Sequence, residues 1–231
     1  MAIESSSGQD HGMLPPPPGV ELLWYGRVAD TAADALGRRD VLDAEESARL
    51  DSFLRPIDRD AYAVAHVRLR QLLGERLGIS PGAVRMARES CVRCGGPHGR
   101  PAVADGGVHF SLSHTRGLVL IGLAPTPVGV DVEGVPDTTT VDDVSGQLHP
   151  RERAELAALP AAERALAFAR CWTRKEALLK GTGAGIGEEL TTTYVGAGPQ
   201  PAGDTGWLIT DLPTLAGYAA AVAVRPGAGN D

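Results

Sequence analysis

The sequence predicts an α+β fold made of two similar units packed side by side. Each half carries a long helix rich in alanine and leucine, then an irregular stretch, then a hairpin that ends in an apolar strand. Those last strands are "GLVLIGLA" (117–124) and "AGYAAAVAV" (216–224). A chain of 231 residues can form one large domain or two small ones with a real core. We expect an N-terminal half over 20–125 and a C-terminal half over 126–231.

The N-terminal half follows a polar segment and a run of four prolines. We expect residues 1–19 to be a disordered tail, with a proline-rich ligand as the alternative. The stretch "ELLWYGRVA" (21–29) has the composition of a strand, and residues 43–78 carry helical periodicity. In "VHFSLSH" (108–114) apolar and polar residues alternate as in a half-buried strand, and a buried strand follows it.

The C-terminal half opens with a strand, "TPVGVDVEGV" (126–135). Two helical segments follow, over 149–159 and 160–181, and Pro160 separates them because proline rarely continues a helix. "GWLITDL" (206–212) and the final apolar strand close this half as a hairpin.

Composition and charge exclude several classes of protein. A hydrophobic fraction of 43% indicates a globular chain, and a formal net charge of −7 argues against a protein that binds duplex nucleic acid. Three cysteines without an even, spaced framework fit a reducing compartment. No run approaches the roughly 18 apolar residues of a membrane span, and the N-terminus lacks the regions of a secretory signal. We expect a cytoplasmic protein without a membrane or nucleic-acid partner.

Two acidic residues stand out in the strand "VGVDVEG" (128–134). Asp131 and Glu133 share one face of this strand, opposite its valines. Carboxylates about 4 Å apart repel each other by about 4 kcal/mol at an effective dielectric of about 20. Either this face is solvated, or a hard divalent cation offsets the repulsion. Mg²⁺ is commonly held by one or two carboxylates together with waters and substrate phosphates.

The helical stretch "WTRKEALLKG" (172–181) places Trp172, Glu176 and Lys180 four residues apart on one face. A surface Glu–Lys pair is a sufficient reason for such a stripe, and it contributes only about 0.3–0.5 kcal/mol. The alternative is that Glu176 adds a third carboxylate to the pair in the preceding strand.

Other residues that could carry chemistry are less informative alone. Ser113 and His114 end a strand where it meets a loop, which is a usual place for binding groups, although a lone histidine is more often structural. Cationic side chains of unknown neighbourhood are Arg49, Arg55, Arg59 and Arg100.

Two further motifs carry weaker signals. "CVRC" (91–94) with His98 offers part of a zinc site, but a fourth ligand is not evident because Cys171 is far along the chain. We therefore interpret this segment as a plain loop. "GTGAGIG" (181–187) follows a helix and lacks the Lys-Ser/Thr ending of a phosphate-binding P-loop, so we expect a flexible connector near the site.

Together these motifs resemble a known family. "GVDVEG", followed about forty residues later by "WTRKEALLKGTGAGI", is similar to the two signature motifs of 4′-phosphopantetheinyl transferases. "FSLSH" and the earlier "GRP" match the larger, surfactin-synthetase-activating (Sfp) type, and the resemblance spans roughly residues 20–225. It implies a pseudo-dimer of two similar α+β halves, each a helix packed on a small, mostly antiparallel sheet. The chain would then be a monomer, because its halves supply the interface that smaller relatives form between subunits.

The resemblance also implies a reaction, in which the phosphopantetheine arm of coenzyme A moves to a serine of an apo acyl or peptidyl carrier protein and 3′,5′-ADP is released. Such an enzyme activates polyketide, nonribosomal peptide or fatty acid synthases. Asp131, Glu133 and Glu176 would hold Mg²⁺, with Mn²⁺ as the alternative metal. Glu176 is the candidate base for the serine hydroxyl. Lys180 would neutralise the leaving phosphate, and Lys175 would contact phosphate beside it.

Both halves would contact coenzyme A, the N-terminal half at its adenosine and 3′-phosphate end and the C-terminal half through the metal and catalytic motifs. Ser113 and His114 match the family pair at the adenosine end, and Arg100 falls on the lysine of a Gly-Lys-Pro motif. Glu46 falls where the family has a lysine, which leaves open which N-terminal arginines hold the 3′-phosphate. The expected coenzyme A contacts are Arg49, Arg55, Arg100, Ser113, His114, Asp131, Lys175 and Lys180.

Two other functions remain open on the sequence. The same acids could act on water in a Mg²⁺-dependent phosphohydrolase. The chain could also be a non-catalytic module that binds carrier proteins and descends from a decayed transferase. The intact set of acids and lysines weighs against decay.

Overall fold

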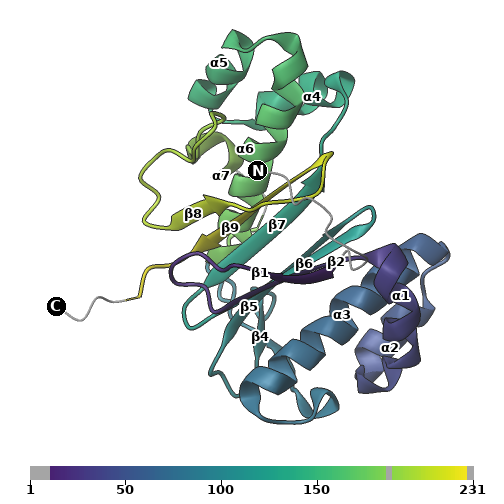
Figure 1. The fold of residues 1–231 in the computed structure, drawn as a ribbon. Coiled ribbons are helices and arrows are strands. Elements are labelled where there is room, and N and C mark those ends of the chain that lie inside the picture. The colour runs from purple at the N-terminus through teal and green to yellow at the C-terminus, as the bar shows by residue number, and fades with distance from the viewer. Residues whose placement is uncertain (1–10, 186–188, 228–231) are drawn as a thin grey trace.

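The computed structural model of the protein describes residues 11–185 and 189–227 (Figure 1). It combines antiparallel sheets with helices, of which α3 (Pro56–Leu77) and α6 (Ala161–Thr182) are the longest. The strands are β1 (His11–Leu14), β2 (Leu22–Arg27), β3 (Met86–Arg88), β4 (Pro101–Val103), β5 (His109–Thr115), β6 (Leu118–Ala124), β7 (Val128–Gly134), β8 (Leu208–Asp211) and β9 (Tyr218–Val224). The helices are α1 (Val28–Gly37), α2 (Ala44–Asp51), α3 (Pro56–Leu77), α4 (Thr138–Val144), α5 (Pro150–Ala158), α6 (Ala161–Thr182) and α7 (Glu189–Thr192). Three short 3-10 turns are η1 (Arg39–Val41), η2 (Pro81–Ala83) and η3 (Ser145–Gln147). The predicted α+β fold is confirmed.

In the N-terminal half, α3 packs against a four-stranded sheet with the order β1-β2-β6-β5 (Figure 1). All neighbouring strands of this sheet are antiparallel. α3 begins at Pro56, which suits a first helical position, and ends before Gly78, whose φ of 69° fits a left-handed cap. Apolar side chains of the helix, including Val64 and Leu72, share one core cluster with Ile121 of β6.

The N-terminal segment differs from the expected tail. β1 pairs with β2 in antiparallel register, and Leu14 is buried in a core cluster with residues of both halves. An apolar anchor of this kind holds an edge strand on the sheet because it removes apolar surface from water. The expectation of a disordered tail over 1–19 is therefore corrected for His11–Leu14. Residues 1–10 lie outside the described part of the chain.

Two predicted elements of the N-terminal half end differently in the structure. The helical region expected over 43–78 is two helices, because the chain turns over residues 52–55 before Pro56 starts α3. The strand expected over 21–29 stops at Arg27, since Val28 begins α1.

In the C-terminal half, α6 packs on the three-stranded sheet β7-β9-β8 (Figure 1). The helix lies very close to the sheet at Gly129, where a Cβ atom would lie 1.8 Å from the carbonyl oxygen of Ala177. Only glycine permits this approach, because any side chain would meet the helix backbone. The close packing brings Glu176 of α6 near the acidic residues of β7, which contribute to its electrostatic environment.

The two main sheets meet at β5 and β7, where serine side chains take the place of backbone pairing. The backbone N–H of Val130 donates to the hydroxyl oxygen of Ser111 at 3.0 Å. The N–H of Val132 donates in the same way to Ser113 at 3.3 Å. The polar face of β5 is thereby held against the strand that carries the acidic residues.

The two longest helices, α3 and α6, have 22 residues each and carry charged side chains along their length. Among the described residues, no helix combines the length and the apolar character that crossing a membrane requires.

Candidate active site

Asp131 is the centre of a polar cluster at the junction of β5 and β7. Only 2% of this residue is exposed. The Ser113 hydroxyl donates a hydrogen bond to Oδ1 of Asp131 at 2.8 Å, and Nζ of Lys180 lies 2.6 Å from the same oxygen. The other oxygen, Oδ2, is buried and has no hydrogen-bond partner in the part of the chain that the structure describes. Buried polar atoms without a partner are rare and costly, so this oxygen is available to a ligand.

Glu176 and Glu133 complete the acidic cluster. Glu176 is buried, and its Oε1 also has no hydrogen-bond partner among the described residues. Glu133 is half-buried and accepts a hydrogen bond from Oγ1 of Thr115 at 3.0 Å. Burial, and after it the negative charge of Asp131, raises the pKa of both glutamates, while Lys180 acts in the opposite direction.

The chemistry of this cluster fits a hard divalent cation. Its acidic side chains are carboxylates, two of their oxygens are buried without a partner among the described residues, and Mg²⁺ and Mn²⁺ prefer oxygen ligands. In the described structure the carboxylate oxygens of Asp131, Glu133 and Glu176 do not all lie within 4.8 Å of one another.

Lys175 projects from a different side of α6 and does not join the cluster. Its ammonium is fully buried, lies 2.8 Å from the Glu152 carboxylate, and donates to the backbone carbonyls of Leu190 and Thr193. These contacts use all three of its donors inside the protein. Five positions along a helix turn a side chain by about 140°, which is why Lys175 and Lys180 face different surroundings. The structure therefore corrects the expectation that Lys175 contacts phosphate.

Arg100 is held by the protein on several sides. Its guanidinium donates to both carboxylate oxygens of Glu89, at 2.6 and 2.9 Å, and to the carbonyl of Gly181 at 2.8 Å. Nδ1 of His109 lies 3.2 Å from the same guanidinium. Arg100 thus clamps the β3–β4 hairpin to the C-terminal end of α6. These four contacts leave one of the five N–H donors of the guanidinium. The expected contact with phosphate would use that donor, and it stays a prediction.

Ser113 and His114 are neighbours on β5 and face different groups, as successive strand residues do. The hydroxyl of Ser113 is engaged by Asp131 and by the β7 backbone, so its role in this structure is to hold the acid. Desolvation, and after it the positive charges of His66 and Lys180, lowers the pKa of His114. A neutral His114 can both donate and accept hydrogen bonds. Its expected contact with coenzyme A stays a prediction.

The two expected arginine contacts of the first helices are exposed. The guanidinium of Arg49 lies over the ring of Phe53, 4.9 Å from its centroid. Arg55 lies at the start of α3, with its Nε 3.3 Å from Asp58. Neither residue is bound deep in the protein, so both remain available to an anion, and their phosphate contacts stay predictions.

Glu46, which falls where the resembling family has a lysine, has a structural role. Its carboxylate lies within hydrogen-bond distance of Arg70 and His66, and it completes a capping box with Asp43 at the start of α2. Arg70 is fully buried, so a carboxylate at position 46 compensates a buried cation. A lysine there would place two cations side by side.

The sequence interpretation missed the residues that hold the acids in place. Ser111 and Thr115 lie on the same polar face of β5 as Ser113, and they bond to the β7 backbone and to Glu133. The alternation of polar and apolar residues contained this signal, because it puts Ser111 and Ser113 on one face. It did not indicate which strand that face would meet.

The glycine-rich connector expected over 181–187 begins inside α6, which ends at Thr182. Gly183 caps the helix in the left-handed conformation, with φ of 73°. Residues 186–188 lie outside the described part of the chain, so the expected flexibility of the connector stays a prediction.

Comparison with known proteins decides the family. The profile of the 4′-phosphopantetheinyl transferase superfamily matches residues 127–223, which contain β7, α6 and the three acidic residues. The 4′-phosphopantetheinyl transferase HetI of Nostoc sp. is 32% identical over 188 residues, which cover 76% of this chain and 76% of that protein. The chain belongs to the 4′-phosphopantetheinyl transferase superfamily.

Two further relatives agree with this assignment. A phosphopantetheinyl transferase of Thraustochytrium sp. is 31% identical over 191 residues, which cover 74% of this chain and 64% of that protein. A 4′-phosphopantetheinyl transferase of Bacillus subtilis is 23% identical over 175 residues, or 74% of this chain and 75% of that protein. The chain is an enzyme of the 4′-phosphopantetheinyl transferase class, as its motifs predicted.

Proposed function

We propose that the protein transfers the 4′-phosphopantetheine arm of coenzyme A to a serine of an apo acyl or peptidyl carrier protein and releases 3′,5′-ADP. Its superfamily supports this class of reaction. One observation carries the proposal to particular residues. Asp131 and Glu176 each keep a buried carboxylate oxygen without a partner in the described structure, next to the ammonium of Lys180.

The carboxylates of Asp131, Glu133 and Glu176 are the groups that would hold Mg²⁺, or Mn²⁺ in its place. When bound, such a cation neutralises charge on the pyrophosphate of coenzyme A. Hydroxyl groups of Ser113 and Thr115 orient two of these carboxylates through hydrogen bonds of 2.8 and 3.0 Å. Groups that orient metal ligands in this way commonly matter for affinity.

The carrier protein supplies the nucleophile in this proposal. Its serine oxygen attacks the phosphorus on the pantetheine side of the pyrophosphate, and the bond from that phosphorus to the oxygen of 3′,5′-ADP breaks. Glu176 accepts the serine proton, a task that suits a buried carboxylate whose pKa is raised. Lys180, partly exposed beside Asp131, places its positive charge where the leaving phosphate develops negative charge.

The N-terminal half would bind the adenosine and 3′-phosphate end of coenzyme A. Arg49 and Arg55 are exposed cations, and His114 lies within the electrostatic reach of Lys180. These groups support an anion site in the N-terminal half. Arg100 would contribute a single donor, because the protein engages the others.

We further propose that residues 20–125 and 126–231 form a pseudo-dimer and that the chain is a monomer. Each half packs a 22-residue helix on an antiparallel sheet, which supports this relationship. The three free cysteines support a reducing, cytoplasmic location. Sedimentation velocity should give the mass of one chain, and an obligate dimer or trimer would contradict the proposal.

Mass spectrometry of a carrier protein tests the proposed reaction. The enzyme is incubated with coenzyme A, Mg²⁺ and apo carriers from polyketide, nonribosomal peptide and fatty acid synthases. We expect at least one carrier to gain the mass of one phosphopantetheine, and neither a carrier lacking its serine nor a reaction with excess EDTA should show this gain. Cleavage of coenzyme A without a carrier would instead support the phosphohydrolase. Binding of a carrier without either reaction would support a non-catalytic module.

A further inference from the structure

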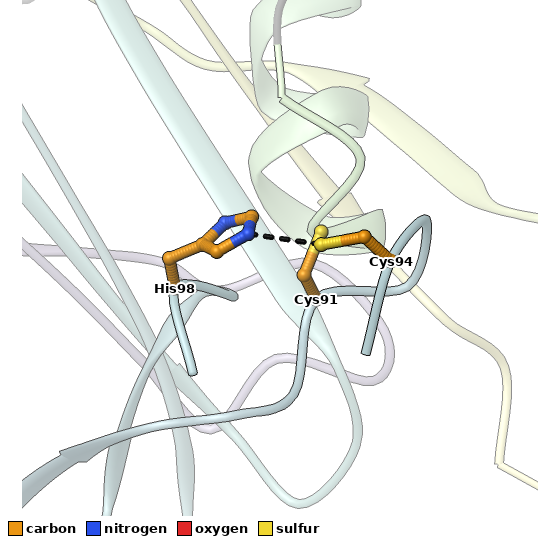
Figure 2. Close-up of side chains that lie close together, drawn as sticks. All are labelled: Cys91, Cys94 and His98. Carbon is orange, nitrogen blue, oxygen red and sulfur yellow. Dashed lines mark hydrogen bonds between the residues drawn. The ribbon is translucent and has the colours of Figure 1, made fainter. Parts of the chain in front are cut away.

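Three metal-binding side chains meet in the loop between β3 and β4, outside the acidic cluster. The ligand atoms of Cys91, Cys94 and His98 all lie within 4.8 Å of one another (Figure 2). The Nε2 atom of His98 lies 3.0 Å from the sulfur of Cys94. Both cysteines are free thiols. The sequence suggested a plain loop here, since spacing alone did not reveal that the histidine folds back onto the two sulfurs.

The backbone of this loop brings the three side chains together. Gly95 has a φ of 72°, in the left-handed region that favours glycine, and its N–H donates to the carbonyl of Cys91 at 2.8 Å. The N–H groups of Cys91 and His98 both donate to the carbonyl of Gly96, at 2.7 and 2.9 Å. A Cβ atom at Gly96 would lie 3.0 Å from the His98 ring and 3.4 Å from the sulfur of Cys94. Glycine at this position therefore leaves room for both ligands.

Two thiolates and an imidazole select a particular kind of cation. Zinc takes these ligands at about 2.3 Å from sulfur and about 2.0 Å from nitrogen, so ligand atoms around one tetrahedral zinc lie about 3.5–3.8 Å apart. The three ligand atoms lie within 4.8 Å of one another, and the distance of 3.0 Å between His98 and Cys94 needs to open by only about half an ångström. Hard cations such as Mg²⁺ prefer oxygen, so this site and the acidic cluster would take different metals.

We propose that Cys91, Cys94 and His98 bind one zinc ion, with a water molecule as the fourth ligand. Cys94 and His98 are exposed, which gives solvent access to the remaining position. Within residues 11–185 and 189–227, no fourth histidine, cysteine or acidic side chain joins the group at the same spacing.

The metal would brace the loop that ends at Arg100. The N–H of Gly99 donates to the carbonyl of Glu89 at 2.9 Å, and the N–H of Glu89 donates to the carbonyl of Arg100 at 3.0 Å. These bonds join the two ends of the loop that contains Cys91, Cys94 and His98. Arg100 in turn holds the carbonyl of Gly181 at the end of α6. Zinc at the tip of the β3–β4 hairpin would therefore stabilise the segment through which Arg100 connects this hairpin with α6.

Elemental analysis of the full-length protein tests the proposal. The chain is produced in medium that contains zinc, kept under reducing conditions, and separated from loose metal by gel filtration. We expect about one zinc per chain in the wild type and in Cys171→Ala, whose sulfur is buried within α6. Cys94→Ser should fall to near zero, because two ligands do not hold zinc through the separation. Circular dichroism and a melting curve establish that each variant is folded.

The absorption spectrum of bound Co²⁺ is a second, independent test of the same ligands. Apoprotein titrated with Co²⁺ should show thiolate-to-metal absorption in the near ultraviolet and the strong visible bands of a tetrahedral site. His98→Asn should weaken the tetrahedral bands and retain the thiolate absorption. Three results would each overturn the proposal. The wild-type protein could contain no zinc, the Cys91→Ser/Cys94→Ser double variant could retain zinc, or the reduced preparation could contain a Cys91–Cys94 disulfide.

Discussion

Nζ of Lys180 lies 2.6 Å from Oδ1 of Asp131, and the pair joins α6 to β7 across 49 positions of sequence. The two partners differ in environment, since the side chain of Lys180 is 33% exposed and that of Asp131 only 2%. The pair is also incomplete. Oδ2 of Asp131 has no partner among the described residues, so the carboxylate can bind a cation on one side while it keeps Lys180 on the other.

We predict that Lys180→Met lowers the rate of carrier modification by about 10²–10³, the usual loss when one group that stabilises a developing anion is removed. The free energy of unfolding should fall by less than it does for loss of the fully buried Lys175, because the side chain of Lys180 is 33% exposed and water reaches it. Rates from mass spectrometry and stability from urea denaturation measure the two effects. A normal rate would show that Lys180 is a structural partner of Asp131 alone.

Lys175→Met should have the opposite pattern, although the two lysines of the chain lie on the same helix. Its loss leaves the carboxylate of Glu152 buried without a cation, which costs about 3–5 kcal/mol. We expect a large drop in the urea midpoint and a rate per folded molecule within a few-fold of the wild type. If Lys175→Met instead has normal stability and a rate as low as that of Lys180→Met, the result would support the expectation that Lys175 contacts phosphate.

The contrast between these lysines shows what the sequence could predict. Local periodicity places Glu176 and Lys180 on one face of a helix and Asp131 and Glu133 on one face of a strand, and the structure brings these faces together. Periodicity does not say which face of α6 is buried against α5 and α7. The partner of Lys175 depends on where Glu152 packs, 23 positions earlier in the chain, and the sequence contains no local signal for that contact.

The N-terminal half shows the same limit. The composition of residues 1–19 is polar and rich in proline, which indicates disorder, but Leu14 supplies an apolar anchor that the average composition hides. In the β3–β4 loop, the spacing of Cys91, Cys94 and His98 was visible. The return of His98 onto the sulfurs depends on Gly95 and Gly96, whose conformations a search for ligand spacing does not consider.

Gly129→Ala should displace α6 from β7. Its Cβ would lie 1.8 Å from the carbonyl oxygen of Ala177 and 2.5 Å from the backbone nitrogen of Gly181, and both are backbone atoms that cannot rotate away. Overpacking of side chains costs about 1–3 kcal/mol, so we expect a loss of at least about 3 kcal/mol here. The matched control is Gly134→Ala in the same strand, where a Cβ meets nothing within 4 Å. Equal urea midpoints for the two variants would contradict this packing.

Asp131→Asn should weaken the binding of coenzyme A in the presence of Mg²⁺. The amide keeps nearly the same shape and can still accept from Ser113, but it lacks the charge that holds a divalent cation. Isothermal titration calorimetry with Mg²⁺ and with EDTA should show that the gain in affinity from the metal is largely lost. Asp142→Asn, an exposed change on α4, should retain it. An undiminished metal effect in Asp131→Asn would place the cation elsewhere.

Glu176→Gln separates catalysis from stability. The substitution is nearly isosteric and glutamine has a similar helix propensity, so the fold should be kept. It removes both a charged metal ligand and the proposed base, and loss of a general base alone commonly costs about 10²–10⁴ in rate. Carrier modification should fall at least that far. The control is Glu163→Gln on the exposed first turn of α6, which should leave the rate unchanged.

In the absence of metal, the difference in melting temperature between Glu176→Gln and the wild type should depend on pH. Because burial and Asp131 raise the pKa of Glu176 in the folded state, its charged form opposes folding once the pH exceeds the unfolded-state pKa. In EDTA at neutral pH, Glu176→Gln should therefore melt at or above the temperature of the wild type. The difference should disappear as the pH falls below the ordinary glutamate pKa of 4.5, because the carboxyl is then protonated in both states. Excess Mg²⁺ should stabilise the wild type more than the variant, because only the wild type keeps all three carboxylates. A variant that melts below the wild type in EDTA at neutral pH would mean that Glu176 is a stabilising ion-pair partner of Lys180.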